Sequence, residues 1–171
     1  MGEIVEIIGG VSYKKNDICN KGIKILRGGN IQDGKVIEYT DDVFISMSYF
    51  QESNCVKKND ILLVASTGSS LLIGKTGFSE KDMKKTQIGA FLRIIRTITP
   101  FNAKYNNILF LSEYYKEYIR NLASGTNINN VKTEYLSNFL LSLPPLSEQK
   151  RIVAKIEELF SLLDQIQTNI V

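Results

Sequence analysis

Histidine is absent from this 171-residue chain, and cysteine occurs only twice, at Cys19 and Cys55. Without an imidazole the chain has no histidine base, no serine–histidine–aspartate triad and no histidine ligand for a metal ion. Two thiols cannot complete a four-cysteine zinc site, and they are too few to hold a disulfide-rich fold together. We therefore expect no metal, no cofactor, no catalytic residue and a reduced, cytoplasmic protein.

Long apolar segments are also lacking. No run approaches the roughly 18 apolar residues of a membrane-spanning helix, and no cationic stretch precedes the apolar part of the N-terminus. The sequence therefore predicts neither a membrane span nor a secretory signal. Apolar residues make up 43% of the chain and charged residues 23%, which is typical of an ordinary folded protein. The length suits one domain, or one domain with a helical extension.

Charge is nearly balanced overall but unevenly placed. The net charge is +3, a small excess for a nucleic-acid-binding protein. Residues 75–104 contain seven basic and two acidic side chains, whereas residues 33–60 contain three basic and six acidic ones. A basic face beside an acidic one suits a polyanion such as DNA. A solvated lysine-rich loop explains the same pattern, so charge alone leaves both interpretations open.

Short apolar segments separated by turns predict a β-rich body over residues 1–146. A strand at residues 23–26 ends at a glycine pair, Asp33 and Gly34 form a hairpin turn, and the run at residues 61–65 is typical of a buried strand. Further strands are expected at residues 71–73 and 90–95. This pattern favours a curled, β-rich α+β domain over a parallel α/β sheet.

Two segments have helical periodicity. Apolar residues spaced by three and four predict a first helix that begins at Asn106 or Asn107 as its N-cap and ends near Gly125. Its tyrosines could stack on bases, although tyrosines on an apolar stripe are more often core residues.

The second helix follows Pro144 and Pro145, with Ser147 as its N-cap. Its apolar residues recur at alternating spacings of four and three, the 3.5-residue period of a coiled coil. These seam residues are Ile152, Ile156, Leu159, Leu163, Ile166 and Ile170. A helix over residues 147–171 would be roughly 37 Å long. This helix is longer than the core of a small domain, so we expect part of it to form an interface with another subunit. The alternative is an amphipathic helix that folds back on its own domain.

Two kinds of segment partly resemble enzyme motifs, but neither meets the requirements of the motif. Five residues separate Gly68 from Gly74, where a phosphate-binding loop needs four, and three of the five are bulky and apolar. The carboxylates two residues before a lysine, at residues 33–35 and 148–150, are explained by a turn and a helix start. We expect no nucleotide hydrolysis, no nuclease chemistry and no enzyme activity from the chain by itself.

The segment LPPLSEQKRIVAKIE, at residues 143–157, resembles a motif in the specificity subunits of type I restriction–modification enzymes. In that family it closes a target recognition domain and opens a long helix. The likeness extends upstream to GIKILRGGNI at residues 22–31, NDILLV at residues 59–64, IGK at residues 73–75 and Gln87.

The resemblance implies a non-catalytic subunit that directs methyltransferase and restriction subunits to a split site in double-stranded DNA. It implies a target recognition domain over residues 1–146 and a conserved coiled-coil helix over residues 147–171. Subunits of this family usually carry two recognition domains, and this chain has room for one. A homodimer paired through the C-terminal helix and one half of a longer subunit both remain open. The alternative function is an assembly adaptor that dimerises without reading DNA.

Candidate DNA-contacting residues follow from side-chain chemistry. Cations in polar, turn-rich segments are expected to contact phosphates, and these are Lys14, Lys15, Lys84, Lys85, Arg96 and Lys104. Arg27 and Asn30 flank a glycine turn and can make bidentate contacts, with guanine and adenine respectively. The secondary candidates are Thr67, Ser69, Ser70 and Gln87. A simple turn-forming role for Asn30 and loop positions for the two serines are the plainer alternatives.

Overall fold

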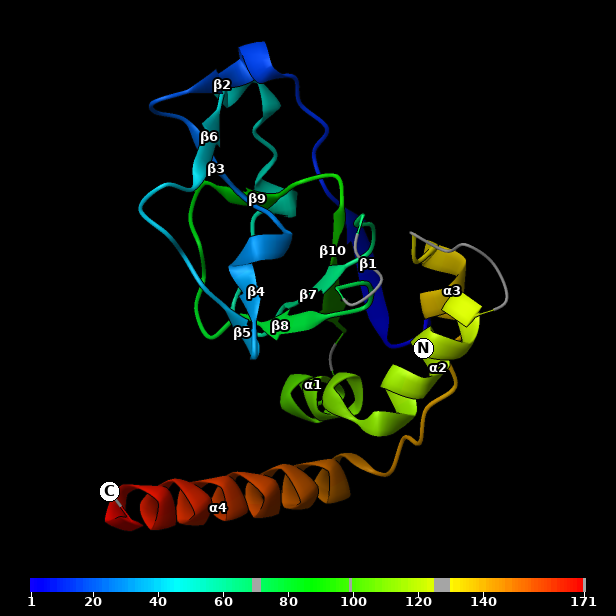
Figure 1. Ribbon diagram of the computed structural model, residues 1–171. Coiled ribbons are helices and arrows are strands. Elements are labelled where there is room, and N and C mark those ends of the chain that lie inside the picture. The colour runs from blue at the N-terminus through cyan, green and yellow to red at the C-terminus, as the bar shows by residue number, and fades with distance from the viewer. Residues whose placement is uncertain (69–71, 99, 125–129, 171) are drawn as a thin grey trace.

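The computed structural model describes residues 1–68, 72–98, 100–124 and 130–170. Figure 1 shows two curled sheets, one above the other, with the shorter helices beside and below the lower sheet and a long C-terminal helix beneath them. Strands come first and the helices follow, so the chain has no alternating strand–helix–strand units in its described part. The expected α+β class is confirmed.

The larger sheet has six strands in the order β1-β10-β7-β8-β5-β4. Its strands are β1 (Val5–Gly9), β4 (Ile31–Gln32), β5 (Gly34–Val36), β7 (Ile61–Val64), β8 (Thr76–Phe78) and β10 (Leu92–Thr97). All four residues of β7 are buried, which confirms the strand predicted from the apolar run.

The smaller sheet has four strands in the order β2-β6-β3-β9. They are β2 (Ile18–Cys19), β3 (Ile23–Leu26), β6 (Val43–Ile45) and β9 (Thr86–Ile88). β6 is antiparallel to both β2 and β3, and β3 is parallel to β9. β2, β3 and β9 therefore run in the same direction, so the N-terminal ends of all three lie at one end of the sheet.

β7 is apolar at every position because each of its faces packs into a different core. Side chains alternate between the faces of a strand, and both faces of β7 are covered. Ile61 and Leu63 pack into a core that the helices complete. Leu62 and Val64 pack into a second core, which includes Leu26 of the smaller sheet. β7 thus joins the two sheets and the helical layer into one body.

The turns bear out some sequence predictions and correct others. Asp33 and Gly34 have φ values of 48° and 76° at the turn that joins the paired strands β4 and β5, as the hairpin prediction requires. The strand expected at residues 71–73 is wrong for its described residues, because Leu72 and Ile73 lie in a turn. The Lys75 N–H donates to the Leu72 carbonyl across that turn.

The strand expected at residues 90–95 begins two residues late, as β10. The Leu92 N–H donates to the Gly89 carbonyl, so a turn occupies the first predicted positions. Leu71 lies outside the described residues.

The first predicted helix is two helices, α1 (Ala103–Leu111) and α2 (Glu113–Ser124). Ser112 interrupts them with an extended backbone, and its hydroxyl donates to the Leu109 carbonyl at 2.6 Å. The predicted cap is also wrong: the Asn102 side chain accepts from the N–H groups of Lys104 and Tyr105. The apolar spacing continues through the break, which is why the sequence does not reveal it. Gly125 lies outside the described residues.

Tyr115 of α2 is a core residue, 2% exposed, and its hydroxyl donates to the Gly74 carbonyl. A short helix, α3 (Thr133–Ser137), follows, and then the long helix α4 (Leu146–Ile170). α4 begins one residue before the predicted N-cap Ser147, because the Pro145 carbonyl accepts the first helical N–H groups. The proline therefore defines the start of the helix.

Gln149 fastens the beginning of α4 to the body. Its side chain is 2% exposed, accepts from the Asn102 N–H at 3.0 Å and donates to the Pro144 carbonyl at 2.8 Å. Val153, one turn later, is also buried. Beyond residue 156 every described side chain of α4 is exposed, so only the first turns of this helix belong to the folded body.

Both cysteines are free thiols. Among the described residues, no helix combines the length and the apolar character needed to cross a bilayer.

Candidate nucleic-acid interface

Lysines gather where the three co-directional strands of the smaller sheet begin. Residues 14 and 15 lead through a 3-10 turn into β2, residue 21 precedes β3, and residues 84 and 85 immediately precede β9. We call this group the lysine end: Lys14, Lys15, Lys21, Lys84 and Lys85. All five are exposed, and none forms an ion pair with a described residue.

The sheet places four of the predicted phosphate contacts at the same end, before its two edge strands β2 and β9, although about seventy residues of sequence separate the two pairs. The Lys24 N–H donates to the Lys85 carbonyl, and the Ser46 N–H donates to the Asp17 carbonyl. These bonds tie the two lysine-bearing segments to adjacent strands. Lys21 was not predicted, and its place just before β3 is the signal that could have found it.

Asp17 orders the segment that carries Lys14 and Lys15. Its carboxylate accepts from the Lys14 N–H at 2.7 Å and from the Tyr49 hydroxyl at 2.9 Å. The bond from the Lys14 backbone, followed by the bond from Tyr49, lowers the pKa of Asp17. The lysine side chains on this turn are exposed, so phosphate oxygens can reach them.

A pocket of about 290 Å³ lies where the two sheets meet, and we call it the junction pocket. Three separate segments line it: Val11, Ser12 and Tyr13; Arg27 and Gly28; and Gly89, Ala90, Phe91 and Leu92. Backbone bonds fix these segments to one another, from Val11 to the Ile88 carbonyl at 2.8 Å and from Gly89 to the Leu26 carbonyl at 2.9 Å. Backbone hydrogen bonds therefore hold the segments of its wall together.

Arg27 is exposed at the edge of the junction pocket. Its guanidinium has no hydrogen bond or ion pair within the described part of the chain, so all its donors are available to a ligand. Thr67 directly follows Ser66, whose N–H donates to the Phe91 carbonyl. Ser69 and Ser70 lie outside the described residues.

Asn30, in contrast, is 3% exposed, and its amide is fully occupied. Its oxygen accepts from the Arg27 N–H at 2.7 Å, and its nitrogen donates to the Ile37 carbonyl and to Asp42 Oδ1. The plainer turn-forming interpretation of Asn30 fits these bonds, which leave the amide no free group to offer a base.

Gln87 is likewise buried, at 0% exposure. Its side-chain oxygen accepts from the Gln51 N–H at 2.8 Å, and its nitrogen donates to the Tyr49 carbonyl at 3.5 Å. It holds the loop between β6 and β7 against the smaller sheet. A base-reading role is incompatible with this position.

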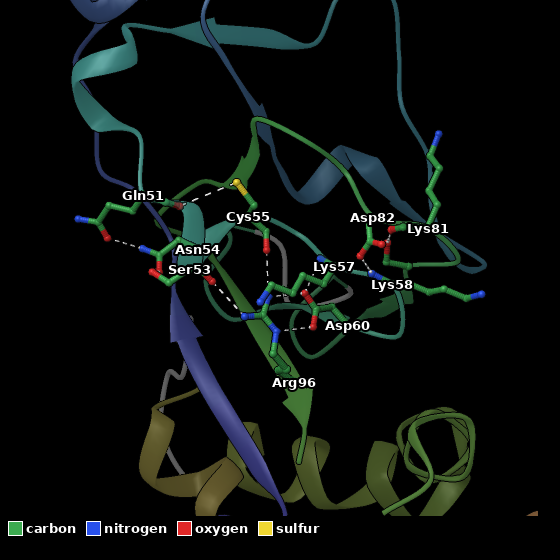
Figure 2. A network of polar contacts seen from close by, with 11 residues as sticks. Gln51, Ser53, Asn54, Cys55, Lys57, Lys58, Asp60, Lys81, Asp82 and Arg96 are labelled. Atoms are coloured by element: carbon green, nitrogen blue, oxygen red, sulfur yellow. Dashed lines mark hydrogen bonds and ion pairs between the residues drawn. The ribbon is translucent and has the colours of Figure 1, made fainter. Parts of the chain in front are cut away.

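Arg96, predicted as a phosphate contact, serves the fold. Figure 2 shows its guanidinium extending from β10 toward the segment before β7, where Nε and Nη2 donate to the two carboxylate oxygens of Asp60 at 2.9 and 2.8 Å. Nη1 and Nη2 also donate to the carbonyls of Ser53 and Cys55, respectively. The hydrogen bonds to Asp60 raise the pKa of Arg96 further above its usual value.

Lys104 is also engaged, through a 2.5 Å ion pair with Glu157 of α4. Both side chains are more than half exposed, so this pair holds α1 and α4 together only weakly. Four of the six predicted phosphate contacts thus remain unpaired among the described residues, and all four belong to the lysine end.

The turn that resembled a phosphate-binding loop is closed to phosphate. The Gly74 N–H donates to the Val64 carbonyl at 2.8 Å, and the Lys75 N–H is also used. Gly74 and Lys75 line a cavity of about 550 Å³ against α2, with an apolar floor that includes Tyr115. Within the described residues, no group of three potential metal-binding side chains comes together.

Comparison with known proteins gives one consistent family. Residues 1–170 match the model of the type I restriction modification DNA specificity domain. The chain is 30% identical over 171 residues to the type I restriction enzyme StySPI specificity subunit of Salmonella potsdam, and 30% identical over 165 residues to the EcoKI specificity subunit of Escherichia coli strain K12. It covers 36% and 35% of these two proteins, and 98% and 94% of it is matched.

Solved structures agree on the fold. The HsdS subunit from Thermoanaerobacter tengcongensis superposes with a TM-score of 0.69 at 20% identity, covering 98% of this chain and 38% of that one. A chain from a structure of a type I R-M system superposes with a TM-score of 0.70, also at 20% identity, covering 98% of this chain and 39% of that one. Compared with the StySPI and EcoKI specificity subunits, the chain spans only about a third of their length.

Proposed function

Because the chain belongs to the type I restriction modification DNA specificity domain family, we propose that it is a non-catalytic module that recognises a sequence in double-stranded DNA. The observation that carries the proposal is the lysine end. Five exposed lysines without ion pairs among the described residues, brought to one end of a sheet, form a phosphate-binding surface.

In this proposal, phosphate contacts and base contacts come from neighbouring parts of the smaller sheet. Lys14 and Lys15 directly follow Tyr13, which lines the junction pocket, so a phosphate-contacting segment continues into it. Lys84 and Lys85 lie one short strand away, roughly 13 Å along β9 from Gly89. Arg27, with its free guanidinium, is the main candidate for a base contact.

We further propose that residues 1–146 are the DNA-binding domain and that residues 147–171 join it to other chains of a type I restriction–modification system. The methyltransferase and restriction subunits would be those partners, acting with the module in the reduced cytoplasm. Seam residues of α4 support this division. Leu159, Leu163 and Ile166 are 48%, 57% and 55% exposed. A contiguous apolar stripe with this exposure is typical of a surface that binds another chain. Ile152 and Ile156 are partly buried, whereas the side chain of Ile170 lies outside the described part.

Self-pairing through α4 is the second part of the proposal. Two copies joined by their seams would present two recognition domains and read a two-fold symmetric site. The same seam would also accept the matching helix of a longer subunit.

The first experiment measures duplex binding by the full chain over a range of salt concentrations. A variant with Lys14, Lys15, Lys84 and Lys85 all changed to Gln should bind every sequence more weakly. Its affinity should also depend less steeply on salt, by about 0.9 in logarithmic slope for each phosphate that the variant no longer neutralises. The control is Lys150→Gln, an exposed lysine of α4.

Sequence selection from random duplexes separates this function from that of an adaptor. A recognition module enriches one sequence, whereas an assembly adaptor enriches none and binds DNA without a steep salt dependence. Mixing the chain with the methyltransferase subunit and a methyl donor should then direct methylation to the enriched sequence. Absence of enrichment would contradict the proposal.

A further inference from the structure

Phe91 is an exposed aromatic side chain that the fold does not use. It is 68% exposed, although a phenylalanine is ordinarily among the most buried residue types. It lies in the turn between β9 and β10, on the wall of the junction pocket. Among the described large apolar side chains only Leu140, which follows α3, has a greater exposure, at 78%.

The backbone of Phe91 is held firmly even though its ring is free. Its carbonyl accepts from the N–H groups of Ala65 and Ser66, at 2.9 and 3.0 Å, at the end of β7. These bonds anchor the residue to the most buried strand of the protein. An exposed side chain on an anchored backbone is positioned for a contact with a ligand, because binding then has to order only the side chain.

The neighbouring glycines leave the pocket open from outside. A β-carbon at Gly29 would meet nothing within 4 Å, and one at Gly28 only atoms of Val64 at 3.9 Å or more. Neither glycine has a positive φ, so the fold requires neither. Gly10 differs, because a β-carbon there would lie 2.0 Å from the Gly89 carbonyl oxygen. The bare backbone beside Arg27 thus gives a large ligand close access.

The surroundings of Phe91 argue against a protein partner. Among the residues that line the junction pocket, Phe91 is the one large apolar side chain that the described structure leaves exposed; the others include serine, glycine and arginine. Protein interfaces need a wider apolar core than one ring provides. A single ring beside a free guanidinium suits the edges of base pairs, where the apolar group of the major groove is the 5-methyl of thymine.

We infer that Phe91 and Arg27 are specificity-determining residues, with the Phe91 ring against the methyl group of a thymine and Arg27 hydrogen-bonded to a guanine of a nearby base pair. This inference rests on the proposed function and deepens it. The two side chains come from different segments that meet at the junction pocket. Arg27 donates two hydrogen bonds to the guanine edge, and Phe91 excludes water from the adjacent methyl group.

The test begins with the sequence that the wild-type chain enriches from random duplexes. Each thymine of that sequence is then replaced by deoxyuridine, which lacks only the methyl group, and affinity is measured for wild type and Phe91→Ala. At one position the wild-type chain should lose about fourfold in affinity, the effect of one buried methyl group. Phe91→Ala should bind thymine and deoxyuridine equally there. In Arg27→Ala, the ratio of affinities for guanine and for another base at the guanine position should fall by about tenfold or more.

Leu140→Ala is the matched control, because it removes an exposed apolar side chain away from the pocket and should change no preference. Urea unfolding should give the same stability for Phe91→Ala as for wild type, since the ring is exposed. A selective wild-type chain whose Phe91→Ala variant still discriminates thymine from deoxyuridine at every position overturns the inference and leaves the proposed function standing. An enriched sequence without thymine would also overturn the inference. So would a Phe91→Ala variant whose affinity falls equally on all sequences. A wild-type chain with no sequence preference overturns the proposed function itself.

Discussion

Gly74 approaches Ile119 so closely that a β-carbon on the glycine would lie 2.7 Å from Ile119 Cγ2. Gly74 also has a φ of 75°, in the left-handed region that other residues avoid. The contact joins the turn before β8 to helix α2, and the hydrogen bond from Tyr115 to the Gly74 carbonyl strengthens it.

Gly74→Ala should therefore destabilise the protein by at least about 2 kcal/mol, from backbone strain and overpacking together. Urea unfolding measures the change. Gly29→Ala is the matched control: its β-carbon meets nothing, so its stability should stay within about 0.5 kcal/mol of wild type. Equal stability of both variants would contradict the close contact.

Arg96→Ala should destabilise the protein by about 3 kcal/mol, because it leaves the 1%-exposed carboxylate of Asp60 without its partner. Urea unfolding again gives the magnitude, with Lys150→Ala as a control at an exposed site. DNA affinity measured well below the unfolding transition should keep its wild-type salt dependence. A stable Arg96→Ala protein with a reduced salt slope would restore Arg96 as a phosphate contact.

Glu38 should make the fold sensitive to acid. Hydrogen bonds from Lys24 and then Lys81 lower the pKa of Glu38 below its ordinary value of 4.5. The folded state then binds this proton less tightly than the unfolded state does. The stabilisation is present above pH 4.5 and is lost as the pH falls through the folded-state pKa.

Glu38→Gln removes that dependence, so its urea midpoint should fall less than the wild-type midpoint between about pH 6 and pH 3. Glu117→Gln, at an exposed position of α2, serves as the control. Parallel pH profiles for wild type and Glu38→Gln would show that the two lysines do not stabilise the carboxylate.

Leu159→Glu combined with Leu163→Glu should convert a dimer into a monomer, because charges replace apolar residues at adjacent positions of the proposed seam. Light scattering coupled to size exclusion measures the mass. Gln165→Glu, on the exposed surface of α4, adds one charge away from the seam and should leave the mass unchanged. An unaltered mass for the double variant would mean that the seam serves a different chain.

Local patterns predicted what depends on neighbouring residues. The apolar run of β7, the Asp33–Gly34 hairpin and the start of α4 after its prolines all follow from residue types close together in sequence. The break at Ser112 was not visible, because the apolar stripe of α1 continues in phase into α2.

Residue type alone could not distinguish a base-reading amide from a structural one. Asn30 and Gln87 have the right chemistry for DNA, but their partners Asp42 and Gln51 lie 12 and 36 residues away. The same is true of Arg96, whose partner Asp60 is 36 residues away. Phe91 was missed for the opposite reason, since its short apolar neighbourhood predicts a core strand and only the fold exposes its ring.

The chain crosses repeatedly between the two sheets, so that from β1 to β10 single strands or pairs of strands join one sheet and then the other. No cut between residues 9 and 92 separates one sheet from the other. Chimeras made from this chain and a relative to change DNA preference should therefore exchange this whole interval as one block. A junction inside the interval would build each sheet from strands of two different proteins. The exposed part of α4 beyond residue 156 lies outside both cores and gives such grafts a natural splice point.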